Sequence, residues 1–449
     1  MYRLQSGFLA GMMQSFTSIG PLLDVAAVFS VIAVFSGIYL PVVMFLSFVL
    51  GYSTIFTLWG LSTRFISNGG YFAYVGKLLG KKAGLFAALI YMSYSIMVVP
   101  DISLFEGGFL KSAFVLGGSG FQFPEAILAF AFAMSPILFT LLGIRKGLRY
   151  TVLAGFIEIG CILFLSAAFL HGETLSAAPF KVTSSGIYYI WTGLVFGILA
   201  FSGSGSSVFI SGNVQSPGKA IPRGILSSYT ISGIIMVISA YSLIIFLGNG
   251  GLQLYETTPY YIGIAVASRF GVYSAYALIA VVAFSGFNLC TSYLNAFLNA
   301  AETAGEGNFF GKRARISMKR NHYLIPVLGA TVLSIFVASI YAGFFTLFVI
   351  IAGAVSLSYI GVHLTLNFAV ARNFRLMGFR MVTVAIISSI AMAAALYYSV
   401  TSNMSSYPAT NYIVLAVVAS AAISTAFLHM NPSYYGEISM KVKEEEFRA

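Results

Sequence analysis

Long apolar segments alternate with short polar stretches along almost the whole chain. A helix needs about twenty apolar residues to cross the hydrocarbon core of a bilayer, whereas membrane-barrel strands have about ten residues of alternating polarity. The pattern therefore predicts transmembrane helices. We expect twelve, at residues 8–35, 39–63, 83–108, 123–144, 150–170, 187–215, 223–248, 272–301, 323–342, 344–371, 381–400 and 411–430, and a short external helix at 259–269.

The composition agrees with burial in a bilayer. Of the 449 residues, 59% are hydrophobic and only 8% are charged, and the mean hydropathy is +0.91. Soluble domains carry about 25% charged residues. Inside a bilayer the protein itself must pair every backbone polar group, which leaves helices or closed barrels. We therefore predict an all-α membrane protein in the lipid bilayer.

The positive charges are distributed unevenly between the two sides of the predicted bundle. The formal net charge is +11. With twelve helices, all 24 Lys and Arg residues except Lys111, Lys181 and Arg269 fall on one side. Basic residues concentrate on the cytoplasmic side of membrane proteins. We therefore expect cytoplasmic termini. The short loops and the lack of a recognisable targeting segment favour a prokaryotic plasma membrane. We expect no nucleic-acid binding, because the loops hold no basic soluble domain.

Residue types that bind metals or catalyse reactions are sparse and scattered. Cys161 and Cys290 lie in separate apolar segments without metal-site spacing, and the four histidines are far apart. The chain has no nucleotide-binding loop and no cluster of catalytic residue types. The sequence therefore predicts no metal, no cofactor and no enzymatic activity.

Two of the predicted helices contain residues that interrupt helical structure, since glycine and proline both weaken helices. Many transporters consist of two inverted repeats whose first helices are broken near the middle of the membrane. The first candidate break, in the first helix, is Thr17, Ser18, Ile19, Gly20 and Pro21; the second, in the sixth, is Ser202, Gly203, Ser204, Gly205, Ser206 and Ser207.

Such breaks can bind a small zwitterion. Freed N–H groups at the start of a half-helix attract a carboxylate, and freed carbonyl groups can accept an ammonium group. For either run alone, close helix packing through small residues is an equally good interpretation. The occurrence of both runs five helices apart favours a substrate-binding site.

Two sequence motifs resemble those of the amino acid–polyamine–organocation (APC) superfamily. Residues 68–80, Asn-Gly-Gly-Tyr-Phe-Ala-Tyr-Val-Gly-Lys-Leu-Leu-Gly, followed by Gly84, are similar to its loop between the second and third helices. Residues 200–203, Ala-Phe-Ser-Gly, and 216–223, Ser-Pro-Gly-Lys-Ala-Ile-Pro-Arg, resemble its break in the sixth helix and the motif that follows.

This resemblance implies a leucine-transporter-like fold with a 5+5 inverted repeat. Ten helices would form a core at 1–371, with repeats at about 8–170 and 187–371. Two additional helices would follow at 381–430, and then a cytoplasmic tail at 431–449. It also implies that the backbone of the two breaks holds the substrate and that Phe201 occludes it as an aromatic gate. Without the motif, Phe201 would be interpreted as one of many core or lipid-facing phenylalanines.

The chain departs from the superfamily pattern at several positions. Acidic residues are usual where Gly60, Gly205 and Asn213 stand, and Ile66 replaces a usual proline. The chain therefore resembles a divergent member. The lost acidic residues in the sixth helix argue mildly against a cationic amino acid as substrate.

Ionisable residues inside a membrane are costly and usually functional. Glu158 lies in the fifth predicted helix, about 12 Å from its cytoplasmic end at 1.5 Å per residue. Burial disfavours the charged form of a carboxyl group, so Glu158 could carry a coupled proton. It could instead bind sodium together with Ser285, Asn288, Thr291 and Ser292, or make a structural hydrogen bond.

Other acidic residues have different expected environments. Asp24 follows the first break and could bind a substrate amine, neutralise a cation or stabilise the start of a half-helix. The remaining candidates, Asp101, Glu106, Glu125, Glu173 and Glu256, are expected at the external helix ends, in contact with water.

These observations predict a permease that moves an amino acid or related small organic solute by alternating access, with proton symport as the leading mechanism. An exchanger or a sodium-coupled carrier of the same fold remains open. A channel is less favoured because paired broken helices are typical of carriers, and a sensor would need a soluble regulatory domain that the loops cannot hold.

Overall fold

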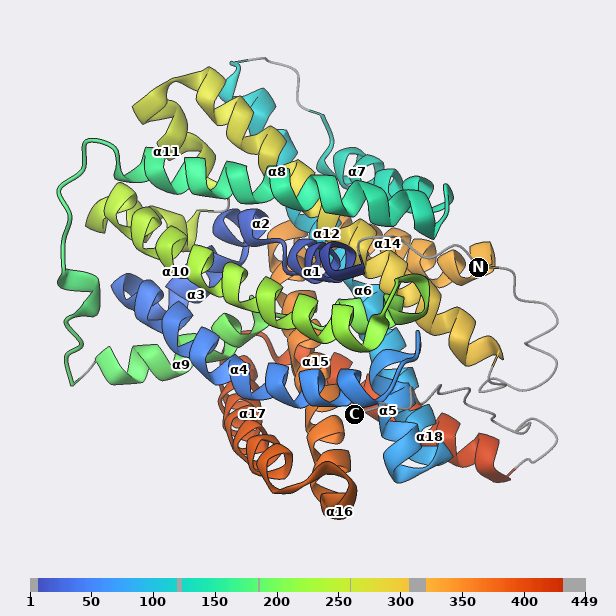
Figure 1. The fold of residues 1–449 in the computed structure, drawn as a ribbon. Coiled ribbons are helices and arrows are strands. Elements are labelled where there is room, and N and C mark those ends of the chain that lie inside the picture. The colour runs from blue at the N-terminus through green and yellow to red at the C-terminus, as the bar shows by residue number, and fades with distance from the viewer. Residues whose placement is uncertain (1–6, 119–122, 185, 259, 307–319, 431–449) are drawn as a thin grey trace.

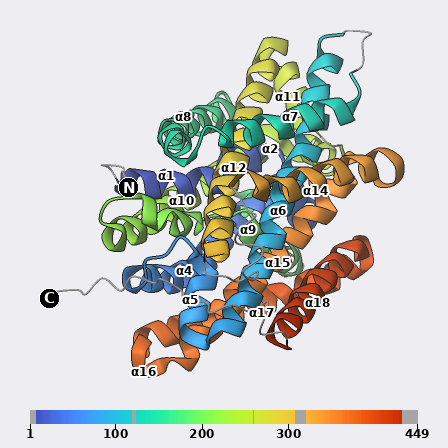
Figure 2. The ribbon, with the colours of Figure 1, turned by 90° about the vertical axis from the view of Figure 1, so that its right-hand side faces the viewer.

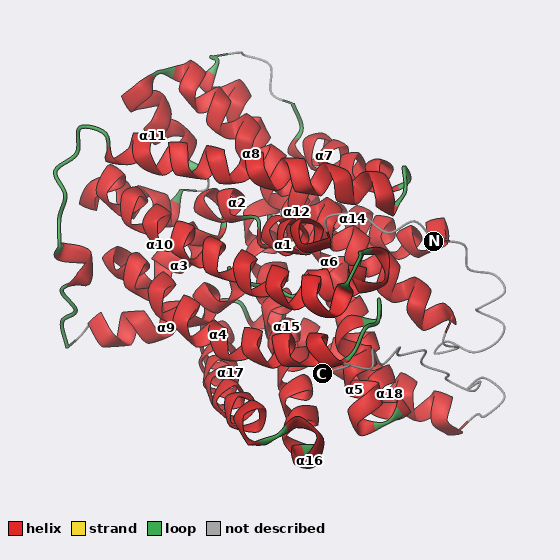
Figure 3. Ribbon diagram, in the orientation of Figure 1, coloured by secondary structure: helices red, strands yellow, loops and turns green. Residues whose placement is uncertain are grey.

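The computed structural model describes residues 7–118, 123–184, 186–258, 260–306 and 320–430. Most of these residues are helical, short loops connect the helices, and none of the described residues is in a strand (Figure 3). The prediction of an all-α protein is therefore confirmed for the described part. The expected cytoplasmic tail at 431–449 lies outside the described residues.

The first half of the chain contains both broken and continuous helices. The expected first helix is divided into α1 (Gly7–Ile19), α2 (Pro21–Ala26) and α3 (Val28–Ser36). The helices that follow are α4 (Leu40–Arg64), α5 (Gly70–Leu79), α6 (Lys81–Leu116), α7 (Glu125–Thr140) and α8 (Ile144–Leu170).

The second half begins with another interrupted helix, since α9 (Gly186–Leu199) is followed by irregular turns and the 3-10 helix η3 (Ser206–Asn213). The remaining helices are α10 (Pro217–Thr257), α11 (Tyr261–Phe270), α12 (Val272–Glu306), α14 (Leu324–Val337), α15 (Phe344–Arg372), α16 (Phe374–Met377), α17 (Phe379–Ser406) and α18 (Pro408–Met430).

Within the described ranges, nine helical segments are long and apolar enough to cross a membrane, which supports a multi-pass membrane protein. One of them, Val28–Arg64, combines α3 and α4. The expected spans at 8–35, 123–144 and 187–215 correspond to shorter pieces, namely α1 to α3, the 16-residue α7, and α9 with η3. The count of twelve spans and the inverted repeat therefore stay predictions.

Two expectations about helix positions were wrong and one was confirmed. Residues 70–79, expected in a loop, form α5, and α6 continues to Leu116 although its predicted end was residue 108. Asp101, Ser103 and Glu106, close to its predicted end, are buried in the protein. The short helix expected at 259–269 is present as α11.

Helices α1 and α2 lie in the interior of the bundle, whereas α9 begins at its edge (Figures 1 and 2). Helix α1 packs against α10, α8 and α12, while α15 packs against α6 and α17. In both views α8 and α11 lie at one edge and α16, α17 and α18 at the opposite edge. Large apolar side chains such as Phe164, Ile390 and Leu415 are exposed, as expected for helices that face lipid.

The predicted orientation can be tested by cysteine labelling. In a chain whose Cys161 and Cys290 are replaced by alanine, we expect Lys181→Cys to react with a membrane-impermeant maleimide in intact cells, because the positive-inside distribution places this exposed residue outside. Lys82→Cys and Arg372→Cys, also at exposed positions, should react only after the membrane is permeabilised. Labelling of Lys82→Cys in intact cells would contradict the orientation.

Candidate functional site

The two interrupted helices touch each other at their breaks. Gly20 separates α1 from α2 and has a left-handed backbone with φ 68°, and Gly203 in the second break has φ 89°. A Cβ atom on Gly203 would lie 2.7 Å from the Ser18 carbonyl carbon and would collide with the carbonyl oxygen. Only glycine combines this φ angle with this close backbone approach.

Serine hydroxyl groups reinforce this contact. The Oγ atoms of Ser18 and Ser206 are 2.7 Å apart, and Ser15 Oγ donates to Ser207 Oγ at 2.9 Å. Ser206 Oγ also donates to the Gln14 carbonyl group at 3.0 Å. The sequence-predicted breaks are therefore adjacent, and their polar atoms largely bind one another.

A small cavity of about 40 Å³ adjoins the breaks. Its lining residues come from five regions of the fold: Ser18, Ile19, Asp24, Val28, Val98, Asp101, Ile102, Ala200, Ser202, Leu289, Tyr293, Phe348, Ala352 and Val355. One water needs about 10–15 Å³ measured in this way. The cavity therefore has room for a few water molecules or one ammonium group, and this conformation is closed to a whole amino acid.

Two carboxyl groups line this cavity. Asp24 of α2 is 3% exposed and Asp101 of α6 is 6% exposed. Within the described residues, Asp24 Oδ2 and Asp101 Oδ1 have no hydrogen-bond partner. Asp101 was expected in water at an external helix end, which is wrong because α6 extends well beyond it.

The same correction applies to Glu106, one and a half turns further along α6. Glu106 is completely buried. Its Oε1 atom lies against Gly286 of α12, where a Cβ would approach to 2.7 Å. Glu106 is not among the described residues that line the small cavity beside the breaks. Glu125 and Glu173, also expected in contact with water, are partly exposed and pair with Lys111 and Arg269. Their place on the external side stays a prediction.

Glu158 lies beside the first break, and its side chain is completely buried. Ser285 donates a hydrogen bond to Glu158 Oε1 and accepts one from the Leu23 N–H at 3.1 Å. The Leu22 N–H and the Asn288 side chain lie near the carboxyl group, but Glu158 Oε2 and Asn288 Nδ2 have no hydrogen-bond partner in the described part. Ser285 thus binds the Leu23 N–H in the first turn of α2 and links it to Glu158.

The other predicted coupling-ion residues divide into two groups. Asn288 belongs with Glu158 and accepts a hydrogen bond from Tyr150 at 2.5 Å. Ser292 instead contacts Thr17, with 2.6 Å between their hydroxyl oxygens. Thr291 is buried, and its hydroxyl group has no hydrogen-bond partner among the described residues. One polar cluster therefore contains Glu158, Ser285 and Asn288. Among the described residues, the side chains of Ser292 and Thr291 make no hydrogen bond to this cluster.

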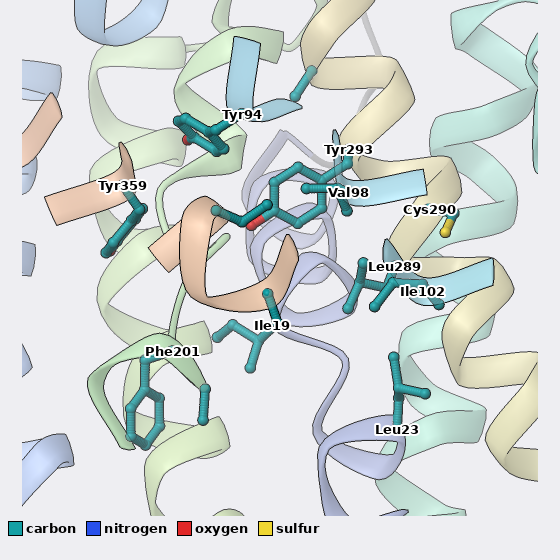
Figure 4. Close-up of a cluster of buried hydrophobic side chains, with 14 of the residues drawn as sticks. Ile19, Leu23, Tyr94, Val98, Ile102, Phe201, Leu289, Cys290, Tyr293 and Tyr359 are labelled. Carbon is teal, nitrogen blue, oxygen red and sulfur yellow. The ribbon is translucent and has the colours of Figure 1, made fainter. Parts of the chain in front are cut away.

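Phe201, the predicted gate, lies in an aromatic cluster between helices. Its ring centroid is 5.2 Å from that of Tyr229 and 6.1 Å from that of Phe48. The neighbouring Ala200 and Ser202 line the cavity, whereas Phe201 is not among the described lining residues. In Figure 4 its ring points away from Tyr293. Its gating role stays a prediction that would require movement of this ring.

The remaining predicted substrate residues shape the break itself. Ser202 Oγ accepts a hydrogen bond from Tyr293 at 3.4 Å, and Ser204 is completely buried. A Cβ on Gly205 would overlap the Tyr71 hydroxyl group. Pro21 is the first residue of α2.

Sequence reasoning missed three residues around the cavity. Tyr293 lies at the centre of the apolar cluster in Figure 4, and Leu289 lies beside it. Leu289 Cδ1 is 2.6 Å from the position of a Cβ on Gly20, so it fills the space beside the first break. Neither residue type stands out among so many apolar residues. Asp101 was identifiable in principle, since it is an acidic residue inside a long apolar run.

The chain matches no protein-family model, and no curated protein matches it either. Within the described residues, no group of three or more His, Cys, Asp or Glu side chains could hold a metal ion. The geometry of the breaks and of the buried carboxyl groups must therefore support any functional proposal.

The Gly203 contact generates a stability prediction. Gly203→Ala should lower the melting temperature of the purified protein more than Gly271→Ala does. Both glycines have nearly the same φ angle, 89° and 87°, so both variants incur about 1–2 kcal/mol of left-handed strain. The two variants differ in their surroundings. A Cβ on Gly203 would collide with the Ser18 backbone, whereas a Cβ on Gly271 has nothing within 4 Å. Equal shifts in the two variants would contradict the close backbone contact.

Proposed function

We propose that this protein is a secondary active transporter that moves a small organic solute, an amino acid or a related compound, across the plasma membrane. The observation that carries this proposal is the meeting of two broken helices beside a small cavity with buried carboxyl groups. In membrane proteins, non-helical backbone is tolerated only where protein or a cavity surrounds it. Its recurrence in two helices is typical of carriers. The resemblance of the two sequence motifs to the APC superfamily supports the same proposal.

The cavity is suited to alternating access. In the present conformation about 40 Å³ is available, which is far below the volume of a typical ligand pocket, about 300 Å³ or more. Binding a solute therefore requires the break region to separate from its neighbours on one side. The contacts between Ser18 and Ser206 and between Tyr293 and Ser202 are polar pairs that such a movement would break and remake.

Glu158 is the proposed site of the coupled proton. It contacts α12 through Ser285 and approaches the backbone at the start of α2. A change in its charge would alter both attachments, because ionised carboxylates form stronger hydrogen bonds than neutral ones. Protonation could thereby loosen α2 from its neighbours. Sodium is the specific alternative, since Ser285 and Asn288 supply further oxygen atoms at the same place.

Uptake into proteoliposomes tests the proposed function directly. A mixture of labelled amino acids and amines should accumulate when an inward proton gradient is imposed, and uptake should collapse to the passive rate when the gradient is abolished. Accumulation driven only by a sodium gradient would indicate that sodium, and not a proton, is the coupling ion at Glu158. Exchange of internal for external solute without any gradient would identify an antiporter. Equal signals in protein-free liposomes and proteoliposomes would contradict transport of these solutes.

Glu158→Gln tests the coupling role. The amide retains the size of the side chain but cannot lose or gain a proton, so we expect solute binding to be kept and uptake to become independent of the proton gradient. Glu173→Gln is a matched control, because Glu173 is partly exposed and pairs with Arg269 far from the breaks. Gradient-dependent uptake of normal size in Glu158→Gln would remove Glu158 from the coupling mechanism.

A further inference from the structure

A groove lies on the surface of the bundle between the end of α4 and the start of α17. Helix α17, at one edge of the bundle, packs against α4 (Figure 1). The groove has a volume of about 560 Å³ and is therefore much larger than the cavity beside the helix breaks. Basic, aromatic and aliphatic side chains line it together, among them Phe56, Trp59 and Arg64 of α4 and Arg380, Met381 and Val384 of α17.

The two arginines lie where helices that are long and apolar enough to cross a membrane reach their ends. Arg64 is the last residue of α4, and Arg380 is the second residue of α17. Both residues are exposed. Neither forms an ion pair with a described carboxylate, and no Asp or Glu is among the described lining residues. The groove therefore has two uncompensated positive charges at the edge of the apolar part of the bundle.

The side chain of Arg64 is held in position by the turn that precedes α17. Its guanidinium group donates to the carbonyl groups of Leu376 and, at 3.4 Å, of Met377. Carbonyl groups have no net charge, so these contacts orient the guanidinium group without neutralising it. Since a guanidinium group has five N–H donors, further donors remain for an anion in the groove.

The rest of the groove is suited to a hydrocarbon chain. Phe56 and Trp59 are exposed, and their rings are in edge-to-face contact with centroids 6.5 Å apart. Along α17, residues in steps of three or four line this groove or a second, apolar pocket of about 290 Å³: Arg380, Val384, Ile387, Ala391, Ala394 and Tyr398. Such steps place residues on one face of a helix. At 1.5 Å per residue this stripe is about 27 Å long, which exceeds the depth of one hydrocarbon leaflet, about 15 Å.

We propose that this groove binds an anionic phospholipid, with its phosphate at Arg64 and Arg380 and an acyl chain along the stripe on α17. Arginine forms strong paired hydrogen bonds with phosphate, and basic pockets between membrane helices are suited to anionic headgroups. A zwitterionic lipid would bring a positive group to two arginines where no described carboxylate could pair with it. A soluble anion would leave Phe56 and Trp59 uncovered.

Tryptophan fluorescence tests the site, because the chain contains only Trp59 and Trp191. In a Trp191→Phe parent protein, Trp59 in the groove is the single fluorophore. The full chain would be reconstituted in mixtures of phosphatidylcholine and phosphatidylglycerol, one of which carries brominated acyl chains that quench a tryptophan in contact with them. Brominated phosphatidylglycerol should be preferred about fivefold or more, as expected for one arginine at a membrane surface. Equal quenching by both lipids would overturn the proposal, as would quenching by neither, which would mean that protein covers the groove.

Variants of this parent assign the preference to the groove. Arg380→Gln should lower it about fivefold, whereas Arg380→Lys keeps the charge and should retain most of it. Arg149→Gln is the matched control, because Arg149 is an exposed arginine on the same predicted side of the membrane, in α8 at the opposite edge of the bundle. An equal loss in Arg149→Gln would indicate general attraction of anionic lipid and would overturn the site. If Arg380→Gln did not fold, the lipid comparison in the parent protein would still decide the question.

A soluble phosphate compound is the other source of the same anionic group. Millimolar inorganic phosphate or glycerol phosphate should leave the preference for phosphatidylglycerol unchanged, relative to sodium chloride of the same ionic strength, since neither compound has an acyl chain. A preference abolished by these anions would overturn the assignment to a lipid. No transported solute is present in these measurements, so their outcome is independent of the proposed function.

Discussion

The close contact between the two helix breaks is the constraint on which the interior of this protein depends. Gly203 lies directly against the Ser18 carbonyl group, and serine pairs on either side hold the two segments together. Because a bilayer offers no water to unpaired backbone groups, each break must find partners within the protein. The surrounding side chains supply them, and their placement determines where a ligand can bind.

Glu158 and Ser285 show how this requirement limits the chemistry of the site. The Leu23 N–H in the first turn of α2 donates to the Ser285 hydroxyl group, which itself donates to the Glu158 carboxyl group. A break that is satisfied in this way is less available to an anionic substrate group. The same arrangement links the break to α8 and α12, so that the charge state of one side chain affects contacts among several helices. Structural support and a coupling role are therefore compatible properties of Glu158.

The sequence predicted an all-helical membrane protein because long apolar segments are typical of helices in a bilayer, and it identified both breaks because glycine, proline and serine have strong local effects. It located Glu158 through its isolation in an apolar run. It misjudged Asp101 and Glu106, since an acidic residue near a predicted helix end is indistinguishable in sequence from one that is buried by its neighbours. Long-range packing places Phe201 against Phe48 and Tyr229 and brings Tyr293 to the cavity. A single sequence has no pattern that indicates such contacts between distant residues.

The position of Asp24 connects solute charge with the direction of coupling. Asp24 and Glu158 are both buried near the first break, and two negative charges in a region of low dielectric would repel each other. Each therefore favours a proton or a cation at the other. A cation bound at Asp24 reduces the negative field at Glu158 and weakens the binding of a proton there. By linkage, a proton at Glu158 weakens binding of the cation to the same extent. Competition of this kind is what an exchanger requires, whereas a neutral solute leaves the field at Glu158 unchanged and is compatible with symport. The net charge of the solute would therefore decide between the two modes of transport for the same set of residues.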